Sequence, residues 1–303
     1  MNTREYKASV SSQIGHFWSA AKNSVLHMIN VARGVDGCVV RAEAPGVRRM
    51  RLFPYLIFYT VALSACTTGA RYEGRENPAQ VVVIASMHRL HGNSSSYGFS
   101  NLYDIVRNEN PDIVAVEIRE EDIKGDESYL SRNYPPEMVS LVGQYPKSVV
   151  GFDWLGSELI GRAIPDNYWS DISEIKKLER AADSDKEIRS PEVDALGSQL
   201  RILLSSATAC SLVDGRYHNL VKARRRMLKA IYEGTKYEPL SQITETREQK
   251  ISENIGSIIR ANPGRKIVVV TGADHAGYVA DYVKGLSPDV AKLQPLRRCS
   301  DGS

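Results

Sequence analysis

The sequence predicts an α/β domain with a mixed, mainly parallel central sheet, flanking helices and a helical middle region. Short β-branched runs at the two ends of the domain, 81–84 and 266–270, are typical of buried strands. Between them, residues 170–260 place apolar side chains at helical spacing among Lys, Glu and Arg. A strand, a helix and a second strand follow one another within about 40 residues, which is the pattern of a parallel βαβ unit.

The predicted elements follow from local signals along the chain. Residues 81–84 read Val-Val-Val-Ile, and the Ser- and Gly-containing segment 94–98 then marks a loop. Leu102, Ile105 and Val106 have the spacing of one helix face. In chain order the predicted strands are 81–84, 113–118, 149–153 and 266–270, a last helix includes 281–286, and 294–303 is a loose tail.

Composition excludes several classes of protein. The 303 residues are 42% hydrophobic and 25% charged with 4 Cys, which fits a globular domain and excludes a disulfide-dense miniprotein. The net charge of +3 comes from the first 51 residues, which hold eight basic and three acidic side chains. The remainder is close to neutral, so charge gives no reason to expect a nucleic-acid partner. The sequence also lacks a phosphate-binding loop, a dinucleotide fingerprint, a G-x-S-x-G elbow and a CxxC pair.

A basic and apolar leader precedes the predicted domain. Residues 48–51 form a basic patch, and 52–65 form an uncharged run that is shorter than the about 20 residues a helix needs to span a bilayer. The run ends in Leu63-Ser64-Ala65-Cys66, which resembles the lipobox of bacterial lipoproteins. That resemblance implies cleavage before Cys66, acylation of Cys66 with fatty acids such as palmitate, and anchoring to a membrane of the cell envelope.

The leader also sets the predicted boundaries. Residues 1–49 are interpreted as an upstream extension before the initiator Met50, and 50–65 as the signal peptide. A polar tether then covers 66–80, the α/β domain 81–290 and the tail 291–303. The alternative for the apolar run is a buried core helix with an incidental cysteine, which Pro54 and the polar residues after Cys66 disfavour.

Two segments of the sequence deliver a histidine in the same way. Residues 81–88 and 268–275 align without a gap, and each runs from a valine-rich strand through small residues to a histidine, His88 or His275. The carboxyl ends of parallel strands meet at one open edge of an α/β sheet, where ligands bind. We therefore expect the two imidazoles to converge although they are far apart in the sequence.

Glu117 is the third candidate site residue. It closes the predicted strand 113–118, and a carboxylate at the end of a buried apolar strand is costly unless it is paired, solvated or bound to a metal. Two imidazoles and a carboxylate are a common ligand set for a catalytic divalent metal. Such a metal lowers the pKa of bound water to about 7 and polarises a carbonyl, which is what amide or ester hydrolysis requires.

The order of these motifs resembles the TraB/Tiki superfamily over about residues 81–283. Gly272-Ala273-Asp274-His275 is similar to the second G-x-x-H motif of that family, and Glu117 to its strand glutamate. Arg247 is similar to the arginine on the helix before the second motif. His88 corresponds to the first motif's histidine. Two positions depart from the pattern, because Ala85 stands where glycine is usual and Gly277 follows His275 one residue early.

The resemblance implies a duplicated β/α fold and, for the Tiki branch, a protease that depends on Mn or Co. His88, Glu117 and His275 would then hold the metal, Glu117 would act in catalysis, and Arg247 would orient a peptide or small-molecule substrate. The relatives also include erythromycin-esterase-like enzymes and the haem-binding lipoprotein ChaN. The alternative function is therefore a haem-binding lipoprotein that uses His88, His91 or Tyr97, and a third is a degenerate family member kept as an interaction module.

Each site residue also has a structural interpretation. His275 is placed to cap the helix that follows it, with Asp274 at the cap, and Glu117 is placed to pair with Arg119 or Arg247. Asp153, at the end of the third predicted strand, would complete a metal shell or act as a general base.

Other titratable residues receive structural interpretations only. His218 is predicted to lie on the surface, and the basic cluster 222–226 to be a solvated helix face. Cys210 lies in an apolar helical segment and is predicted to be a core residue. Whether it pairs with Cys299 stays open at this stage.

Overall fold

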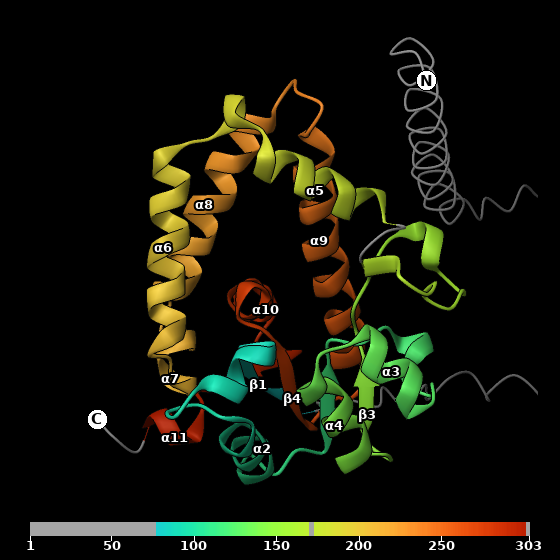
Figure 1. Cartoon of the computed structure of the whole chain (residues 1–303). Coiled ribbons are helices and arrows are strands. Elements are labelled where there is room, and N and C mark those ends of the chain that lie inside the picture. The colour runs from blue at the N-terminus through green and yellow to red at the C-terminus, as the bar shows by residue number, and fades with distance from the viewer. Residues whose placement is uncertain (1–76, 170–172, 301–303) are drawn as a thin grey trace, which may run out of the picture. The chain divides into compact units, whose positions relative to one another are not determined.

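The computed structural model describes residues 77–169 and 173–300, and these form an α/β domain on a five-stranded, all-parallel sheet (Figure 1). The predicted extension, signal peptide and lipobox cysteine, and nearly all of the tether, lie outside the described residues. The strand order is β3-β2-β4-β1-β5. The strands are β1 (Ala79–Ser86), β2 (Ile113–Val116), β3 (Val149–Gly151), β4 (Lys266–Gly272) and β5 (Ala291–Leu293).

The two central strands, β1 and β4, explain why the sheet forms. Their valine and isoleucine side chains are almost completely buried, as expected for parallel strands that are covered on both faces. β1 and β4 pair in parallel with Ser86 opposite Gly272, and β2 pairs with the other edge of β4, with Val116 opposite Val270. The four strands predicted from β-branched runs are thus confirmed.

The direction of the crossovers creates an open crevice between β1 and β4. The chain leaves β1 through α2 (Phe99–Asn108) toward β2, and it leaves β4 through α10 (Ala273–Gly285) toward β5. Crossovers between parallel strands are right-handed almost without exception, so two that run in opposite directions place their helices on opposite faces, and α2 and α10 lie on opposite sides of the sheet (Figure 1). The carboxyl edge between β1 and β4 is therefore the topological switch point, the usual position of a ligand in such folds.

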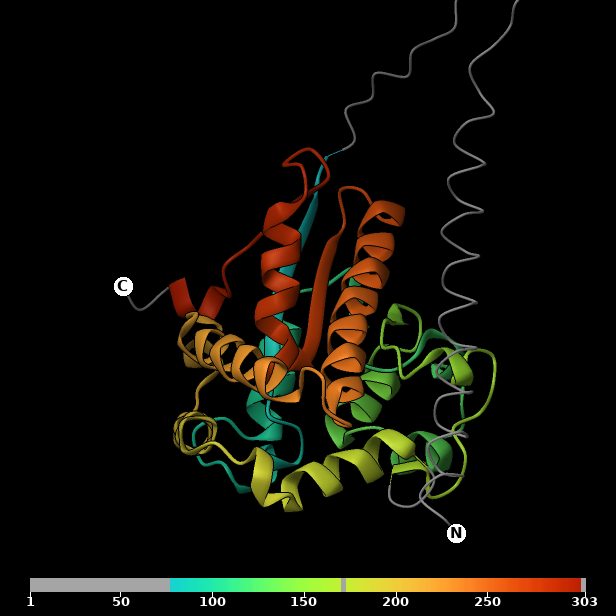
Figure 2. The ribbon, with the colours of Figure 1, turned by 90° about the horizontal axis from the view of Figure 1, so that it is seen from above.

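The predicted helical middle region is confirmed and forms a frame around α10 in Figure 1. A small second core of Ala182, Tyr237 and Leu240 joins α5 to the start of α9. In Figure 1, α5 runs across the top of the frame toward α9, on the side of α10 away from the strands, and Figure 2 shows the same ribbon from above. The frame helices are α5 (Glu174–Ser184), α6 (Pro191–Ser205), α7 (Ala209–Val213), α8 (Arg216–Tyr232) and α9 (Glu238–Ala261).

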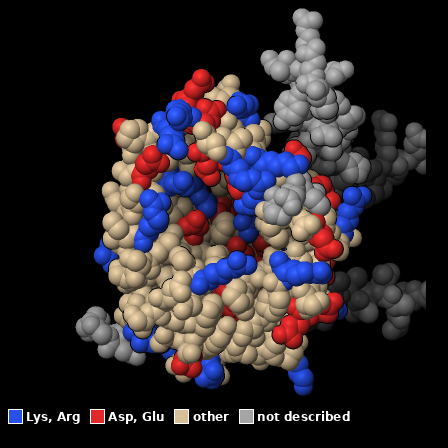
Figure 3. Space-filling view, in the orientation of Figure 1, with Lys and Arg blue, Asp and Glu red and all other residues tan. Residues whose placement is uncertain are grey.

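The frame surrounds a hollow on the face of the molecule drawn in Figure 3. Acidic side chains are visible at its floor, and Lys and Arg side chains surround it. Among residues 77–169 and 173–300, no helix is both long enough and apolar enough to cross a bilayer. The remaining elements are α3 (Glu127–Asn133), α4 (Pro136–Gln144), α11 (Arg297–Ser300) and the short 3-10 helices η1 (His88–Asn93), η2 (Glu120–Asp122), η3 (Ser157–Leu159) and η5 (Lys186–Ile188).

The segment predicted as a tail is instead partly built into the fold. β5 pairs with the start of β1, with Ala79 opposite Ala291, and the Gln294 amide donates to the Val81 carbonyl at 2.7 Å. The prediction was wrong here because Ala-Lys-Leu contains no β-branched residue and its pairing depends only on the neighbouring strand. The predicted tether likewise ends early, since β1 begins at Ala79.

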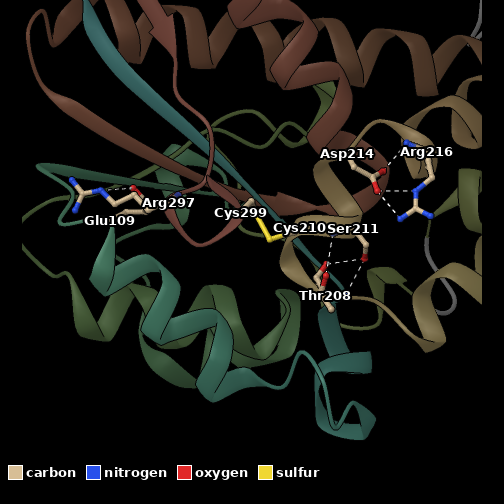
Figure 4. The surroundings of a disulfide bond; sticks show 8 residues. All are labelled: Glu109, Thr208, Cys210, Ser211, Asp214, Arg216, Arg297 and Cys299. Carbon is tan, nitrogen blue, oxygen red and sulfur yellow. Dashed lines mark hydrogen bonds and ion pairs between the residues drawn. A yellow bond between two sulfur atoms is a disulfide. The ribbon is translucent and has the colours of Figure 1, made fainter. Parts of the chain in front are cut away.

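A disulfide joins Cys210 of α7 to Cys299 of α11 (Figure 4). The two cysteines are 89 residues apart in the sequence, so the pairing that the sequence left open is present, and Cys210 is half-buried and not a fully buried core residue. Two further contacts hold the same C-terminal segment, because the Arg297 amide and guanidinium both bind the buried Glu109 carboxylate. The C-terminal segment therefore ties the helical frame to the sheet.

We expect removal of this disulfide to lower stability. A Cys210→Ser/Cys299→Ser variant should lose about 2–4 kcal/mol of unfolding free energy, because closing a long loop restricts the unfolded chain. Thermal unfolding of the full chain measures this, with and without dithiothreitol. The reductant should lower the melting temperature of the wild type toward that of the variant and leave the variant unchanged. Equal melting temperatures for both proteins without reductant would contradict the expectation.

Candidate functional site

The three predicted ligands, His88, Glu117 and His275, lie together at the switch point. His88 begins η1 directly after β1, Glu117 follows β2, and His275 lies in the first turn of α10 after β4. The Nε2 atom of His275 lies 3.6 Å from Oε1 of Glu117. A methyl group added at Gly272 would lie 2.5 Å from Nε2 of His88 and 3.4 Å from Oε2 of Glu117. The convergence predicted from the strand ends is therefore present.

The backbone at the end of β1 directs His88 toward β4. His88 has a φ of +53°, a left-handed conformation that few residues other than glycine adopt, and it turns the chain sharply out of the strand. Its amide donates to Oγ of Ser86 at 3.0 Å, which stabilises this turn. Gly272 leaves the space that the imidazole occupies at the end of β4.

Glu117 is buried and held as a carboxylate from three sides. Its Oε2 accepts hydrogen bonds from Oγ1 of Thr271 and the amide of Gly272, both at 2.7 Å. Its Oε1 accepts from Nη2 of Arg247 at 2.9 Å. Burial raises the pKa of Glu117, but the charges of His275, Arg247 and His88 outweigh it and hold the pKa well below the usual range.

Arg247 bridges two buried carboxylates. Its Nε and Nη2 donate to Oδ1 of Asp153 at 3.0 and 2.9 Å, and Nη2 also bonds Glu117. Burial is the largest influence on Asp153 and raises its pKa, with the Glu117 charge adding to it and Arg247 opposing it. Of the two partners expected for Glu117, Arg247 is the one used, since Arg119 binds Asp122 instead.

Each histidine is held through its other ring nitrogen by a second carboxylate. Nδ1 of His88 lies 2.8 Å from Oε1 of Glu137 on α4, and Nδ1 of His275 lies 2.5 Å from Oε1 of Glu248 on α9. Burial lowers the pKa of both histidines, but the bonds to these carboxylates and the charge of Glu117 raise it, and the net shift is upward for each. The Nε2 atoms of both rings are left facing Glu117 and the end of β4.

Sequence reasoning missed the roles of Glu137, Glu248 and Arg225. The sequence suggests only that Glu248 is an acid near a predicted helix end, whereas it lies in the middle of α9, and no pattern distinguishes Glu137 in the segment between β2 and β3. Arg225, which was predicted to be solvated, is half-buried, with its Nη1 on Oε1 of Glu248 at 2.5 Å and its guanidinium over the Tyr278 ring. The Arg225 side chain points toward Glu248 because of how α8 packs against α9. The spacing of apolar residues along α8 does not predict that packing.

His91 and Tyr97, the further candidates for haem, are engaged inside the protein. His91 accepts the Met87 amide on Nε2 at 2.9 Å, and its Nδ1 lies 2.6 Å from the Tyr97 carbonyl. The Tyr97 hydroxyl donates to the Ala85 carbonyl at 2.9 Å. These groups brace the loop after β1, and of the three candidates only His88 offers a partly exposed ring, with 40% of its side chain accessible.

His218 is buried, so the prediction of a surface position was wrong. Its Nε2 lies 3.0 Å from Oδ2 of Asp281, and its ring packs against Gly277, where an added Cβ would lie 2.1 Å from the imidazole. The early glycine after His275 therefore makes room for α8 to pack on α10. The position of Gly277 is therefore explained by helix packing alone, without reference to a metal site.

The donor set suits a divalent cation in its chemistry. Two imidazole Nε2 atoms and one carboxylate converge, and each imidazole has the carboxylate on its far nitrogen that metal-binding histidines usually have. Within the part of the chain that the structure describes, no group of three or more His, Cys, Asp or Glu side chains has the geometry of a formed metal site. A bound metal would thus require the donor side chains to move from the positions they have in this structure.

Comparisons of the chain with protein-family models, curated proteins and solved structures find no match.

We expect Gly272→Ala to displace His88. The new methyl group would lie 2.5 Å from Nε2, a distance that real contacts do not allow, so the ring or the strand end must move at a cost of about 1–3 kcal/mol. Thermal unfolding and the imidazole NMR signals of His88 measure the two effects. Gly143→Ala on α4, where an added Cβ meets nothing within 4 Å, is the matched control. An unchanged His88 signal in Gly272→Ala would contradict the placement of the ring.

Proposed function

We propose that this chain is a hydrolase of peptide or ester bonds that depends on a divalent metal, similar to the TraB/Tiki superfamily. The observation that supports it is the convergence of His88, Glu117 and His275 at the carboxyl edge between β1 and β4. The hollow in Figure 3 lies on the face toward which the strand carboxyl ends point, and in this proposal a substrate would enter from that face. Resemblance to the Tiki branch favours Mn or Co as the metal.

In this proposal His88, Glu117 and His275 hold the metal. When bound, the metal would supply a water molecule of lowered pKa and polarise the scissile carbonyl. Glu117 is suited to a cation because its low pKa keeps it ionised across the physiological range. The raised pKa values of the two histidines mean that metal binding would compete with protons, so uptake should weaken as the pH falls.

Arg247 has a positioning role in this proposal. Its fork fixes Glu117 and Asp153 relative to each other, and 30% of its side chain remains accessible. A guanidinium at this point would also attract a substrate carboxylate or carbonyl. The first role rests on the hydrogen bonds of Arg247 in this structure, and the second on the family resemblance.

We further propose that the protein is exported and anchored to a membrane of the cell envelope by acyl chains on Cys66. The disulfide between Cys210 and Cys299 supports export, since disulfides persist mainly in oxidising compartments. The near-neutral charge after Cys66 gives little electrostatic help, so the acyl chains would provide most of the membrane affinity. No nucleic-acid partner is part of this proposal.

Metal uptake tests the hydrolase proposal directly. The wild type, stripped with a chelator and incubated with Mn²⁺, should retain metal after gel filtration, and His275→Gln should lose most of it because one of the three ligands is gone. His218→Gln, which removes another histidine that packs on α10, should retain metal and serves as the control. Hydrolysis of model esters and peptides should follow the metal content.

Equal metal in the wild type and His275→Gln would contradict the proposal. So would an absence of metal uptake together with a Soret band on adding haem, which would instead favour the ChaN-type alternative. Circular dichroism of each variant excludes unfolding as the cause of a loss.

Membrane attachment is tested by Cys66→Ser. The variant should move from the membrane fraction to the soluble fraction of its bacterial host, because it has no acyl chains, and labelled palmitate should be incorporated only into the wild type. A variant that fractionates as the wild type does would contradict the lipid anchor.

A further inference from the structure

Two buried carboxylates approach the site from opposite layers of the fold. Glu137 comes from α4, on one face of the sheet, and Glu248 from α9, on the other. Each contacts Nδ1 of one candidate ligand, His88 or His275. We infer that Glu137 and Glu248 are a matched pair of positioning residues, which fix the tautomer and direction of the two imidazoles so that both Nε2 lone pairs face a divalent cation beside Glu117.

The surroundings of Glu137 indicate more than a packing role. Its side chain is completely buried, and its Oε1 accepts from Oγ of Ser86 at 2.6 Å as well as contacting His88. Its Oε2 is buried without a hydrogen-bond partner among the described residues. Ser86 is the last residue of β1, so this carboxylate is tied to the strand end that delivers His88.

Glu248 repeats this arrangement on the other side. Oε1 accepts from Nη1 of Arg225 and contacts Nδ1 of His275, both at 2.5 Å, and within the described part of the chain its Oε2 has no hydrogen-bond partner and is buried. Arg225 also donates to the Asp274 carbonyl at 3.3 Å, so it links the carboxylate to the turn that carries His275. In both glutamates Oε1 makes the contacts, and Oε2 has no hydrogen-bond partner among residues 77–169 and 173–300.

An unpaired buried carboxylate oxygen destabilises the fold, so a stability argument alone does not explain two of them. Their common feature is the histidine. Oε1 of Glu137 accepts from Oγ of Ser86 and Oε1 of Glu248 accepts from Nη1 of Arg225, so the oxygen that faces each imidazole acts as an acceptor. An imidazole that donates Nδ1–H to a carboxylate has its lone pair on Nε2, which is the form that binds a metal.

The inference rests on the proposed metal site, but part of its test does not. In metal-free protein at neutral or slightly alkaline pH, ¹⁵N NMR should report the Nδ1–H tautomer for neutral His88 and His275. Glu137→Ala and Glu248→Ala should each shift the tautomer equilibrium of their own histidine toward Nε2–H. The effect should be local, because the two carboxylates contact different rings.

Mn²⁺ affinity supplies the second readout. Each alanine variant should bind Mn²⁺ about 10–100-fold more weakly than the wild type, the usual effect of losing such a carboxylate. Glu137→Gln and Glu248→Gln keep an acceptor oxygen without the charge and should recover part of the affinity. Glu245→Gln, one turn before Glu248 on α9 and paired with Lys229 on the surface, is the control and should bind as the wild type does.

The outcomes are distinguishable. If the alanine variants keep the wild-type tautomers and affinity, the inference is overturned. If the tautomers shift as expected but the wild type binds no Mn²⁺, the proposed metal function fails and the positioning role stands. Should Glu248→Ala fail to fold because Arg225 loses its partner, Glu248→Gln carries the same comparison.

Discussion

The ionised carboxylate of Glu117 is the constraint on which this architecture depends. A charge at the end of a buried strand is stable only if neighbouring groups replace water, and Arg247, Thr271 and the Gly272 amide do so. These partners come from α9 and β4, so the Glu117 charge fixes the position of α9 relative to the sheet. Arg247 extends the constraint to β3 through Asp153. Three strands and a helix are thereby aligned around one carboxylate.

The sheet topology explains why chemistry collects at this point. The crossovers that leave β1 and β4 run in opposite directions, which leaves the carboxyl edge between them uncovered. The helical insertion between β3 and β4 then rises around the edge as a frame and leaves the hollow of Figure 3 open. The disulfide attaches one end of that frame, at α7, to the segment after β5. The helical frame that surrounds the site is thus also covalently attached to the C-terminal segment of the domain.

The sequence predicted the strands, the helical middle region and the meeting of His88, Glu117 and His275, because β-branched runs mark buried strands and parallel strands share a carboxyl edge. It did not predict β5, whose three residues form a strand only through pairing with β1. Glu137 and Arg225 were also missed, since their roles arise from how α4 and α8 pack and not from any local pattern. His218 shows the same limit, because a glycine on α10 opens its buried position.

The most direct test of the central claim is anomalous diffraction from crystals of the protein grown with Mn²⁺. The account predicts a single strong peak between the Nε2 atoms of His88 and His275 and beside the Glu117 carboxylate, with Glu137 and Glu248 still bound to the Nδ1 atoms. No peak at this edge of the sheet, with the Glu117 carboxylate still bonded to Arg247, Thr271 and the Gly272 amide, would contradict it.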